Sequence, residues 1–196
     1  MCTEEGKEQG YTVERCETTV PVPVKEYVEQ CVDVAAFLEC CRQCGNYDQT
    51  WACPSFDFDV IQYWEKYRSF HIIGLKLRLS EKLRQKVLTK EEQEEVISQI
   101  LWKEKAKLSE ELFAEEKKYP GSISLSAGSC QNCRKGTCTR LEGKPCRFPE
   151  KMRYSIEALG GNVGLTVTKY LKQELEWIQE GRLPEHFMLV SGLLLP

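Results

Sequence analysis

The sequence predicts an α+β fold, with a small mixed sheet packed against helices and two cysteine-rich metal-binding loops. Alternating or β-branched segments are interspersed with segments of helical periodicity, and eight of the 11 cysteines fall into two runs. The 196 residues, of which 41% are hydrophobic, are enough to bury one compact core. We therefore expect residues 1–196 to form a single domain, with residues 1–15 as a flexible N-terminus.

The first half of the chain is expected to supply two strands and a helix. Residues 18–24 are rich in β-branched side chains but contain two prolines, which is typical of an edge strand. Apolar residues recur at helical intervals over residues 25–40, so this segment should be a helix that ends in the first cysteine run. Residues 70–79 alternate from Leu75 onward and should form a strand with one solvated face.

A long helix is expected over residues 90–118. Thr89 and Glu92 have the spacing of a capping box at its start, and the segment Tyr119-Pro120-Gly121 ends the helical pattern. Residues 122–126 alternate again and predict a short strand that leads into the second cysteine run.

The C-terminal quarter is expected to contain two helices and a strand. Pro149 suits the first turn of a helix, which Gly160-Gly161 would close. Residues 167–178 carry the apolar stripe of a further helix. The apolar residues 187–190 should form a strand at the centre of the sheet.

The cysteine runs provide the strongest functional signal. Each run holds one C-x2-C pair and two further thiols within about a dozen residues, and thiolates at such spacing converge on a metal. The expected ligands are Cys41, Cys44, Cys53, Cys130, Cys133, Cys138 and Cys146. Cys40 is a less expected ligand, because its side chain should diverge from that of its neighbour. The isolated Cys2, Cys16 and Cys31 are expected to be ordinary small apolar residues.

The two runs differ in the number of thiols that they offer. The second run has four and can close a site unaided, whereas the first has three besides Cys40. The first site either borrows a ligand from the second run or leaves one metal position open. No catalytic residue is assigned.

The spacing favours iron–sulfur chemistry over zinc. Zinc sites of structural type usually combine two C-x2-C pairs or mix cysteine with histidine, and each run here has only one pair. Iron–sulfur sites accept irregular spacing and often have proline directly after a ligand, as in Cys53-Pro54. His71 and His186 are expected to be ordinary packed or surface residues. We predict one or two 4Fe–4S clusters, with zinc as the alternative metal.

Several segments resemble an uncharacterised family of predicted metal-binding proteins, a domain of unknown function common in anaerobic bacteria and methanogens. The resemblance rests on Cys41-Arg42-Gln43-Cys44-Gly45-Asn46-Tyr47, Trp51-Ala52-Cys53-Pro54 and Pro145-Cys146-Arg147-Phe148-Pro149, and extends from about Val20 to the end. It implies metal binding by these cysteines and names no activity. The family pattern has no cysteine where Cys40 stands and tends to two prolines where this chain has Pro54-Ser55.

The charge and composition of the chain limit the classes of partner that we expect. The net charge of −3 argues against a nucleic-acid binder, and no stretch reaches the roughly 20 apolar residues of a membrane span. The residues at 1–7 lack a signal-type leader, so we expect a cytoplasmic protein with reduced thiols. The oligomeric state is left open. Residues 130–153 hold seven basic and two acidic side chains, which would offset thiolate charge or dock an acidic protein redox partner.

The predicted function is therefore electron transfer, or service as the cluster-bearing accessory of an anaerobic enzyme system. The alternative is a zinc-stabilised interaction module without redox activity. A shell that limits water access to the first run is expected from the aromatic residues Tyr47, Trp51, Phe56, Phe58, Tyr63, Trp64 and Tyr67.

Overall fold

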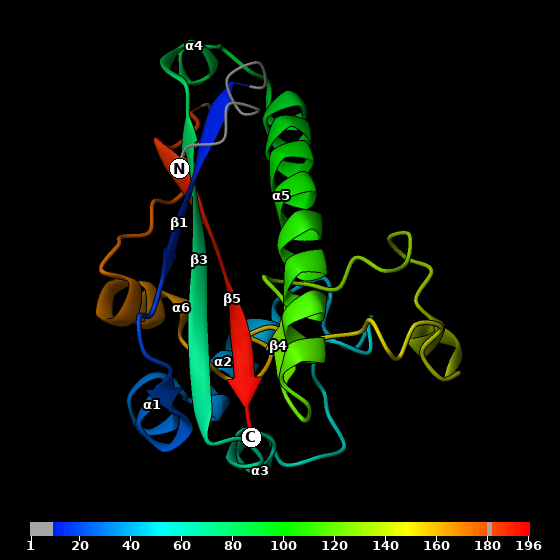
Figure 1. The fold of residues 1–196 in the computed structure, drawn as a ribbon. Coiled ribbons are helices and arrows are strands. Elements are labelled where there is room, and N and C mark those ends of the chain that lie inside the picture. The colour runs from blue at the N-terminus through cyan, green and yellow to red at the C-terminus, as the bar shows by residue number, and fades with distance from the viewer. Residues whose placement is uncertain (1–9, 180–181) are drawn as a thin grey trace.

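The computed structural model describes residues 10–179 and 182–196 and has an α+β fold built on one sheet (Figure 1). The strand order is β1-β3-β5-β4, with the short β2 also paired to β3. Every pairing between these strands is antiparallel, in place of the mixed sheet that we expected. The strands are β1 (Tyr11–Glu17), β2 (Val22–Pro23), β3 (Ser69–Leu79), β4 (Ile123–Leu125) and β5 (His186–Leu195).

Helices cover both faces of the sheet. They are α1 (Val24–Cys31), α2 (Val34–Arg42), α3 (Val60–Glu65), α4 (Glu81–Arg84), α5 (Lys90–Lys118) and α6 (Val163–Thr166), which continues into a π-helical turn (Val167–Leu171). None of the helices in the described part of the chain is both long and apolar enough to cross a membrane.

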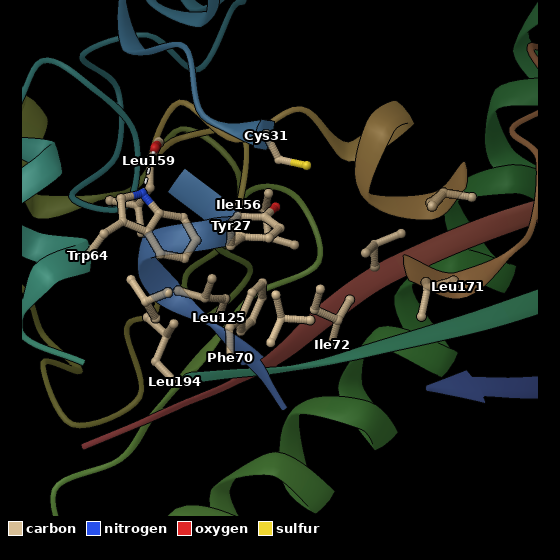
Figure 2. Packing of buried hydrophobic residues seen from close by; sticks show 14 of the residues in the cluster. Tyr27, Cys31, Trp64, Phe70, Ile72, Leu125, Ile156, Leu159, Leu171 and Leu194 are labelled. Atoms are coloured by element: carbon tan, nitrogen blue, oxygen red, sulfur yellow. Dashed lines mark hydrogen bonds between the residues drawn. The ribbon is translucent and has the colours of Figure 1, made fainter. Parts of the chain in front are cut away.

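Strand β3 buries both of its faces, so it separates two cores. The odd-numbered residues from Ile73 to Leu79 pack with Leu108 and Leu112 of α5. The even-numbered Phe70 and Ile72 pack on the opposite side with α1, α3 and the π-helical turn. Figure 2 shows this second core, in which Tyr27 lies beside Phe70 and Trp64, with ring centroids 5.0 and 5.2 Å away. The expectation of one solvated face was therefore wrong for most of this strand.

The predictions for α5 and for the central strands are confirmed. Helix α5 begins and ends where expected, and its capping box joins the Thr89 hydroxyl and the Glu92 side chain to each other's backbone amides. Strand β5 lies between β3 and β4, at the interior of the sheet. The edge strand with two prolines is reduced to β2, because Pro21 and Pro23 cannot donate ladder hydrogen bonds.

The single helix expected over residues 25–40 is divided into α1 and α2. Val32 is extended and bridges to Gly161, and the Asp33 amide donates to the Gly160 carbonyl at 2.8 Å. The Asp33 side chain then caps α2 by accepting from the Ala36 amide at 2.9 Å. The apolar periodicity continues through this break, although the apolar residues of α1 are buried and those of α2 are at most half-buried.

Two further helix predictions were wrong. Pro149 starts only a turn, in which the Met152 amide donates to the Phe148 carbonyl, and no regular helix follows before Gly160. The helix expected over residues 167–178 ends at Lys172, which has a left-handed φ of 54°. Its apolar residues beyond this point follow the surface without helical structure.

Strand β1 and helix α3 were not predicted. Residues 11–15, which we expected to belong to a flexible N-terminus, form most of β1 and pair with β3. The rest of that expected flexible segment, residues 1–9, lies outside the described residues. Helix α3 is six residues long and starts at Asp59, whose side chain accepts from the Gln62 amide at 2.8 Å.

A methyl group at Gly192 is expected to destabilise the sheet. A Cβ there would lie only 2.6 Å from the Phe70 ring and would overlap the His71 carbonyl. We expect Gly192→Ala to cost about 1–3 kcal/mol or more by overpacking, and to lower Tm by several degrees. Gly45→Ala is the matched control, because no atom lies within 4 Å of its Cβ. Equal melting temperatures for the two variants would contradict this interpretation.

Candidate metal centre

The first cysteine run begins on the last turns of α2 and continues through a compact loop. The Cys44 amide donates to the Cys41 carbonyl at 2.9 Å, and the Cys53 amide donates to the Thr50 carbonyl at 3.2 Å. Cys40 and Cys44 are exposed, whereas Cys41 and Cys53 are half-buried. Successive residues of a helix point about 100° apart. Cys40 and Cys41 therefore face different directions, as the sequence predicted.

The thiols of the first run lie within electrostatic reach of one another. Burial raises the pKa of the Cys41 thiol, and the neighbouring Cys53, Cys44 and Cys40 raise it further. Burial likewise raises the pKa of Cys53. The Cys44 sulfur accepts a hydrogen bond from the Asn46 amide at 3.5 Å. A cation bound near Cys41 and Cys53 would favour their thiolate form.

The second run, together with the first loop and α5, lines a hollow of about 390 Å³, which we call the second-run hollow. The segment that carries this run follows β4 and extends away from the sheet beside α5 in Figure 1. All four cysteines of the run line the hollow, together with Trp51 of the first loop and Trp102 of α5. These four, each half-buried, are Cys130, Cys133, Cys138 and Cys146.

Three sulfurs of the second run already have N–H donors. The Phe148 amide lies 3.4 Å from the Cys146 sulfur, and a guanidinium nitrogen of Arg147 lies 4.0 Å from that of Cys133. Burial raises the pKa of Cys130, while the Asn132 amide, as a hydrogen-bond donor to the sulfur, acts in the opposite direction. Donors of this kind stabilise metal-bound thiolates and tune the potential of iron–sulfur clusters.

Arg140 of the second run forms hydrogen bonds and an ion pair with the loop of the first run. It comes from a 3-10 helix (Thr139–Glu142) in the second run, and its guanidinium donates to the backbone carbonyls of the first loop at Thr50, Cys53 and Ser55. It also pairs with Asp48 and lies 5.4 Å from the centroid of the Trp51 ring. The Trp51 indole in turn donates to the Lys144 carbonyl at 3.0 Å.

A buried lysine of α5 lies between the two runs. The Lys105 ammonium donates to the Ser129 carbonyl, directly before Cys130. Burial lowers the pKa of Lys105 to about 8, although Cys130, Glu157 and Cys53 act in the opposite direction. Lys105 therefore interacts with thiols of both runs. Sequence reasoning missed it, because it is one of many lysines in a highly charged helix.

Glu157 approaches the first run from the turn that ends at Gly160. It lines a second hollow of about 290 Å³ together with Cys41, Pro54 and the rings of Phe56 and Phe58. We call this the Glu157 hollow. Burial raises the pKa of Glu157, and Oε2 of its carboxylate is shielded from solvent without a hydrogen-bond partner.

The basic residues of the second run divide into two groups. Arg140 and Arg153 are largely buried and form ion pairs within the protein. Arg140 pairs with Asp48, and Arg153 pairs with Glu116 of α5 at 2.6 Å. The other five are exposed: Arg134, Lys135, Lys144, Arg147 and Lys151.

The aromatic residues near the first run form a cluster of packed rings. Phe56 stacks on Phe58 with centroids 4.8 Å apart, and Tyr63 packs edge-on against Tyr154 at 5.3 Å. Phe56 and Phe58 form a wall of the Glu157 hollow, as expected of an apolar shell, whereas Trp64 belongs to the core.

The remaining cysteines and both histidines lie outside the two runs. Cys31 is buried in the core and Cys16 packs against it, as expected, while Cys2 lies outside the described residues. His71 is half-buried on β3. His186 is buried at the start of β5, where it pairs with Glu176 at 2.9 Å and contacts the Glu174 carbonyl.

The donor chemistry of both runs suits a thiophilic metal. Cysteine thiolates bind zinc and iron–sulfur clusters, and the sulfurs of Cys44 and Cys146 accept hydrogen bonds from backbone amides. Among residues 10–179 and 182–196, no three His, Cys, Asp or Glu side chains lie close enough together to hold a single metal ion.

Comparison with known proteins identifies the family. The family model described as "Predicted metal-binding protein (DUF2284)" matches residues 28–195, a range that includes both cysteine runs. No curated protein and no solved structure matches the chain. Because the family match spans most of the chain, the protein belongs to the predicted metal-binding family DUF2284, a domain of unknown function.

Proposed function

We propose that this protein is a cytoplasmic carrier of one or two 4Fe–4S clusters. Cys130, Cys133, Cys138 and Cys146 would hold one cluster, and Cys41, Cys44 and Cys53 would ligate the other. The protein would transfer electrons or serve as the cluster-bearing accessory of an anaerobic enzyme system. Bound clusters would supply one-electron redox chemistry.

The single observation that carries this proposal is the second-run hollow with its four thiols. Four thiolates around one zinc ion, at Zn–S distances of about 2.3 Å, gather within about 4 Å of one another. A cubane places four irons and four sulfides between its thiolates and so needs a wider enclosure. The second-run hollow of about 390 Å³, which the first loop and α5 also line, has room for the larger group.

The surroundings of the thiols add independent support. Amide donors at Asn46 and Phe148 point at sulfurs of the first and second runs. Each such hydrogen bond offsets part of the negative charge that a cluster with four thiolates carries. The buried ammonium of Lys105 provides a positive charge between the runs.

The exposed cations support an acidic protein as the redox partner. Arg134 and Lys135 are exposed and line the second-run hollow itself, and no carboxylate lines that hollow. A partner with acidic side chains around its own redox centre would be drawn to this rim, at a rate that falls with ionic strength.

Metal analysis of protein purified without oxygen tests the function. We expect brown protein with iron and acid-labile sulfide in equal amounts, about four of each per cluster, and visible absorption that bleaches with dithionite. Cys146→Ala should remove one cluster, whereas Cys40→Ala, an exposed thiol, should leave the iron content nearly unchanged.

A colourless protein with stoichiometric zinc and no sulfide would overturn the iron–sulfur proposal. That result would favour the zinc-stabilised interaction module. The turn that joins Cys41 to Cys44 has the C-x2-C spacing from which such sites are also built.

A further inference from the structure

A hollow of about 240 Å³ lies between α5 on one side and β4 and the start of the second run on the other, and we call it the α5–β4 hollow. Its α5 wall is a stripe at helical spacing that includes Trp102, Lys105, Ala106, Ser109 and Phe113. Strand β4 passes beside this part of the helix in Figure 1. Typical sites for drug-sized ligands measure about 300–1,000 Å³, so this hollow suits a small molecule.

The lining of the α5–β4 hollow carries a surplus of positive charge. Arg153 lines it but is neutralised by its buried ion pair with Glu116. The other charged residues of the lining are Lys105, Lys151 and the exposed Glu110. Two ammonium groups against one carboxylate leave a net charge of about +1, although the whole chain has a net charge of −3.

The buried ammonium of Lys105 has more donors than the fold uses. Lys105 is only 7% exposed and donates to the Ser129 carbonyl, which accounts for one of the three N–H groups of an ammonium. Glu157 and the thiols of Cys130 and Cys53 act on it electrostatically, but no ion pair in the described part of the chain includes it. A buried cation without a paired anion costs free energy, so the site favours a ligand that brings a negative charge.

The same hollow also offers hydroxyl groups and apolar surface. Ser109 and Ser126 contribute hydroxyls that can donate to a carboxylate. Trp102, Phe113 and Leu125 contribute apolar surface, and the Trp102 side chain is left 53% exposed. A ligand with a flat, apolar body would therefore cover part of the Trp102 ring.

We propose that the α5–β4 hollow binds a small aromatic carboxylate, with the carboxylate on Lys105 and Lys151 and the ring against Trp102. A single negative charge balances the surplus of the lining, whereas a phosphate group carries about −1.5 to −2 at pH 7. Cys130 and Asn132 line both this hollow and the second-run hollow, so the molecule would bind next to the candidate metal centre. The inference is independent of the metal, because no cysteine binds the carboxylate.

Isothermal titration calorimetry of the full chain at pH 7 tests the inference with three probes: benzoate, its neutral isostere benzamide, and inorganic phosphate. We expect benzoate to bind at least about tenfold more tightly than either of the others, because it alone combines a single charge with a ring. Failure of benzoate to bind, or equal Kd values for benzoate and benzamide, would overturn the proposal. Tighter binding of phosphate would overturn the assignment of an aromatic carboxylate.

Two variants test whether benzoate occupies this hollow. Lys105→Met removes the buried ammonium, and Ala106→Leu fills the hollow with a residue that suits a helix, so each should raise the Kd of benzoate at least about tenfold. Lys144→Met and Ala114→Leu are the matched controls, because both residues are exposed and neither lines the hollow. Wild-type affinity in the first two variants, or equal losses in the controls, would contradict this site.

Thermal unfolding separates a lost contact from a damaged fold. Lys105→Met should melt close to the wild type, because an apolar side chain of similar length replaces a buried ammonium without an ion pair. Where this variant melts lower, Ala106→Leu decides, since it adds atoms and removes no polar group. An unchanged Kd of benzoate in Ala106→Leu would then overturn the proposal.

Discussion

If the first cysteine run holds a metal as proposed, replacing Arg140 with alanine is expected to release that metal although it removes no thiol. The guanidinium holds three carbonyls and the Asp48 carboxylate of that loop in place. Hydrogen bonds to charged groups contribute about 1.5–3 kcal/mol each, and their loss leaves the carbonyls around Cys53 without donors. The loop should then open, and iron content should fall to that of Cys53→Ala.

Two control variants make this prediction specific. Lys144→Ala removes an exposed basic residue of the same run that does not line the second-run hollow, and it should retain full metal content. Arg140→Lys keeps the charge but cannot reach all four acceptors with one ammonium, so we expect partial loss. Full metal content in Arg140→Ala would show that the first loop keeps its form without this arginine.

Replacing Arg153 with methionine is expected to produce the largest loss of stability. The side chains of Arg153 and Glu116 are only 12% and 15% exposed, and two hydrogen bonds of 2.8 and 2.6 Å join them. Removal of one partner from a buried ion pair leaves an uncompensated charge and costs about 3–5 kcal/mol. Thermal unfolding should reveal this as a Tm lower by roughly 10 °C.

The pH dependence supplies an internal check on the ion pair. Burial by itself would raise the pKa of Glu116, but hydrogen bonds from Arg153 and Ser124 outweigh it, so the pKa lies below its usual value. The pair therefore stabilises the fold fully above the unfolded-state pKa of about 4.3 and loses this contribution as pH falls through the folded-state value. The difference between wild type and Arg153→Met should shrink in acid.

Lys118→Met is the matched control for Arg153→Met. It breaks an exposed pair with Glu115 on the same helix, and such pairs contribute at most about 1 kcal/mol. A similar Tm for both methionine variants would contradict the importance of burial.

The elements predicted correctly are those whose signals are local. The capping box at Thr89 fixes the start of α5, and the apolar residues of β3 and β5 are consistent with strands at the sheet interior. The failures involve competing tertiary contacts. The bridge between Val32 and Gly161 interrupts a continuous helical pattern, and β1 is stabilised by its pairing with β3.

The sequence predicts the candidate donors that lie close together along the chain, and misses the contacts between distant segments. Spacing marks the cysteines as the predicted donors, and the structure leaves both Cys40 and Cys44 exposed. Arg140, Lys105 and Glu157 act on thiols distant in sequence, so no local pattern marks them. Arg140 is one of seven basic residues between positions 130 and 153. The composition of this segment does not show which of the seven contacts the first run.

The interior position of β5 has a consequence for the order in which the protein folds. Phe70 of β3 pairs with Leu194, and Ile123 of β4 pairs with the same residue, so neither strand has its full set of partners until residues 186–195 have left the ribosome. Contacts of such long sequence separation form slowly. Both cysteine runs are therefore synthesised before β5 completes the sheet, so their thiols leave the ribosome before the fold around them has formed.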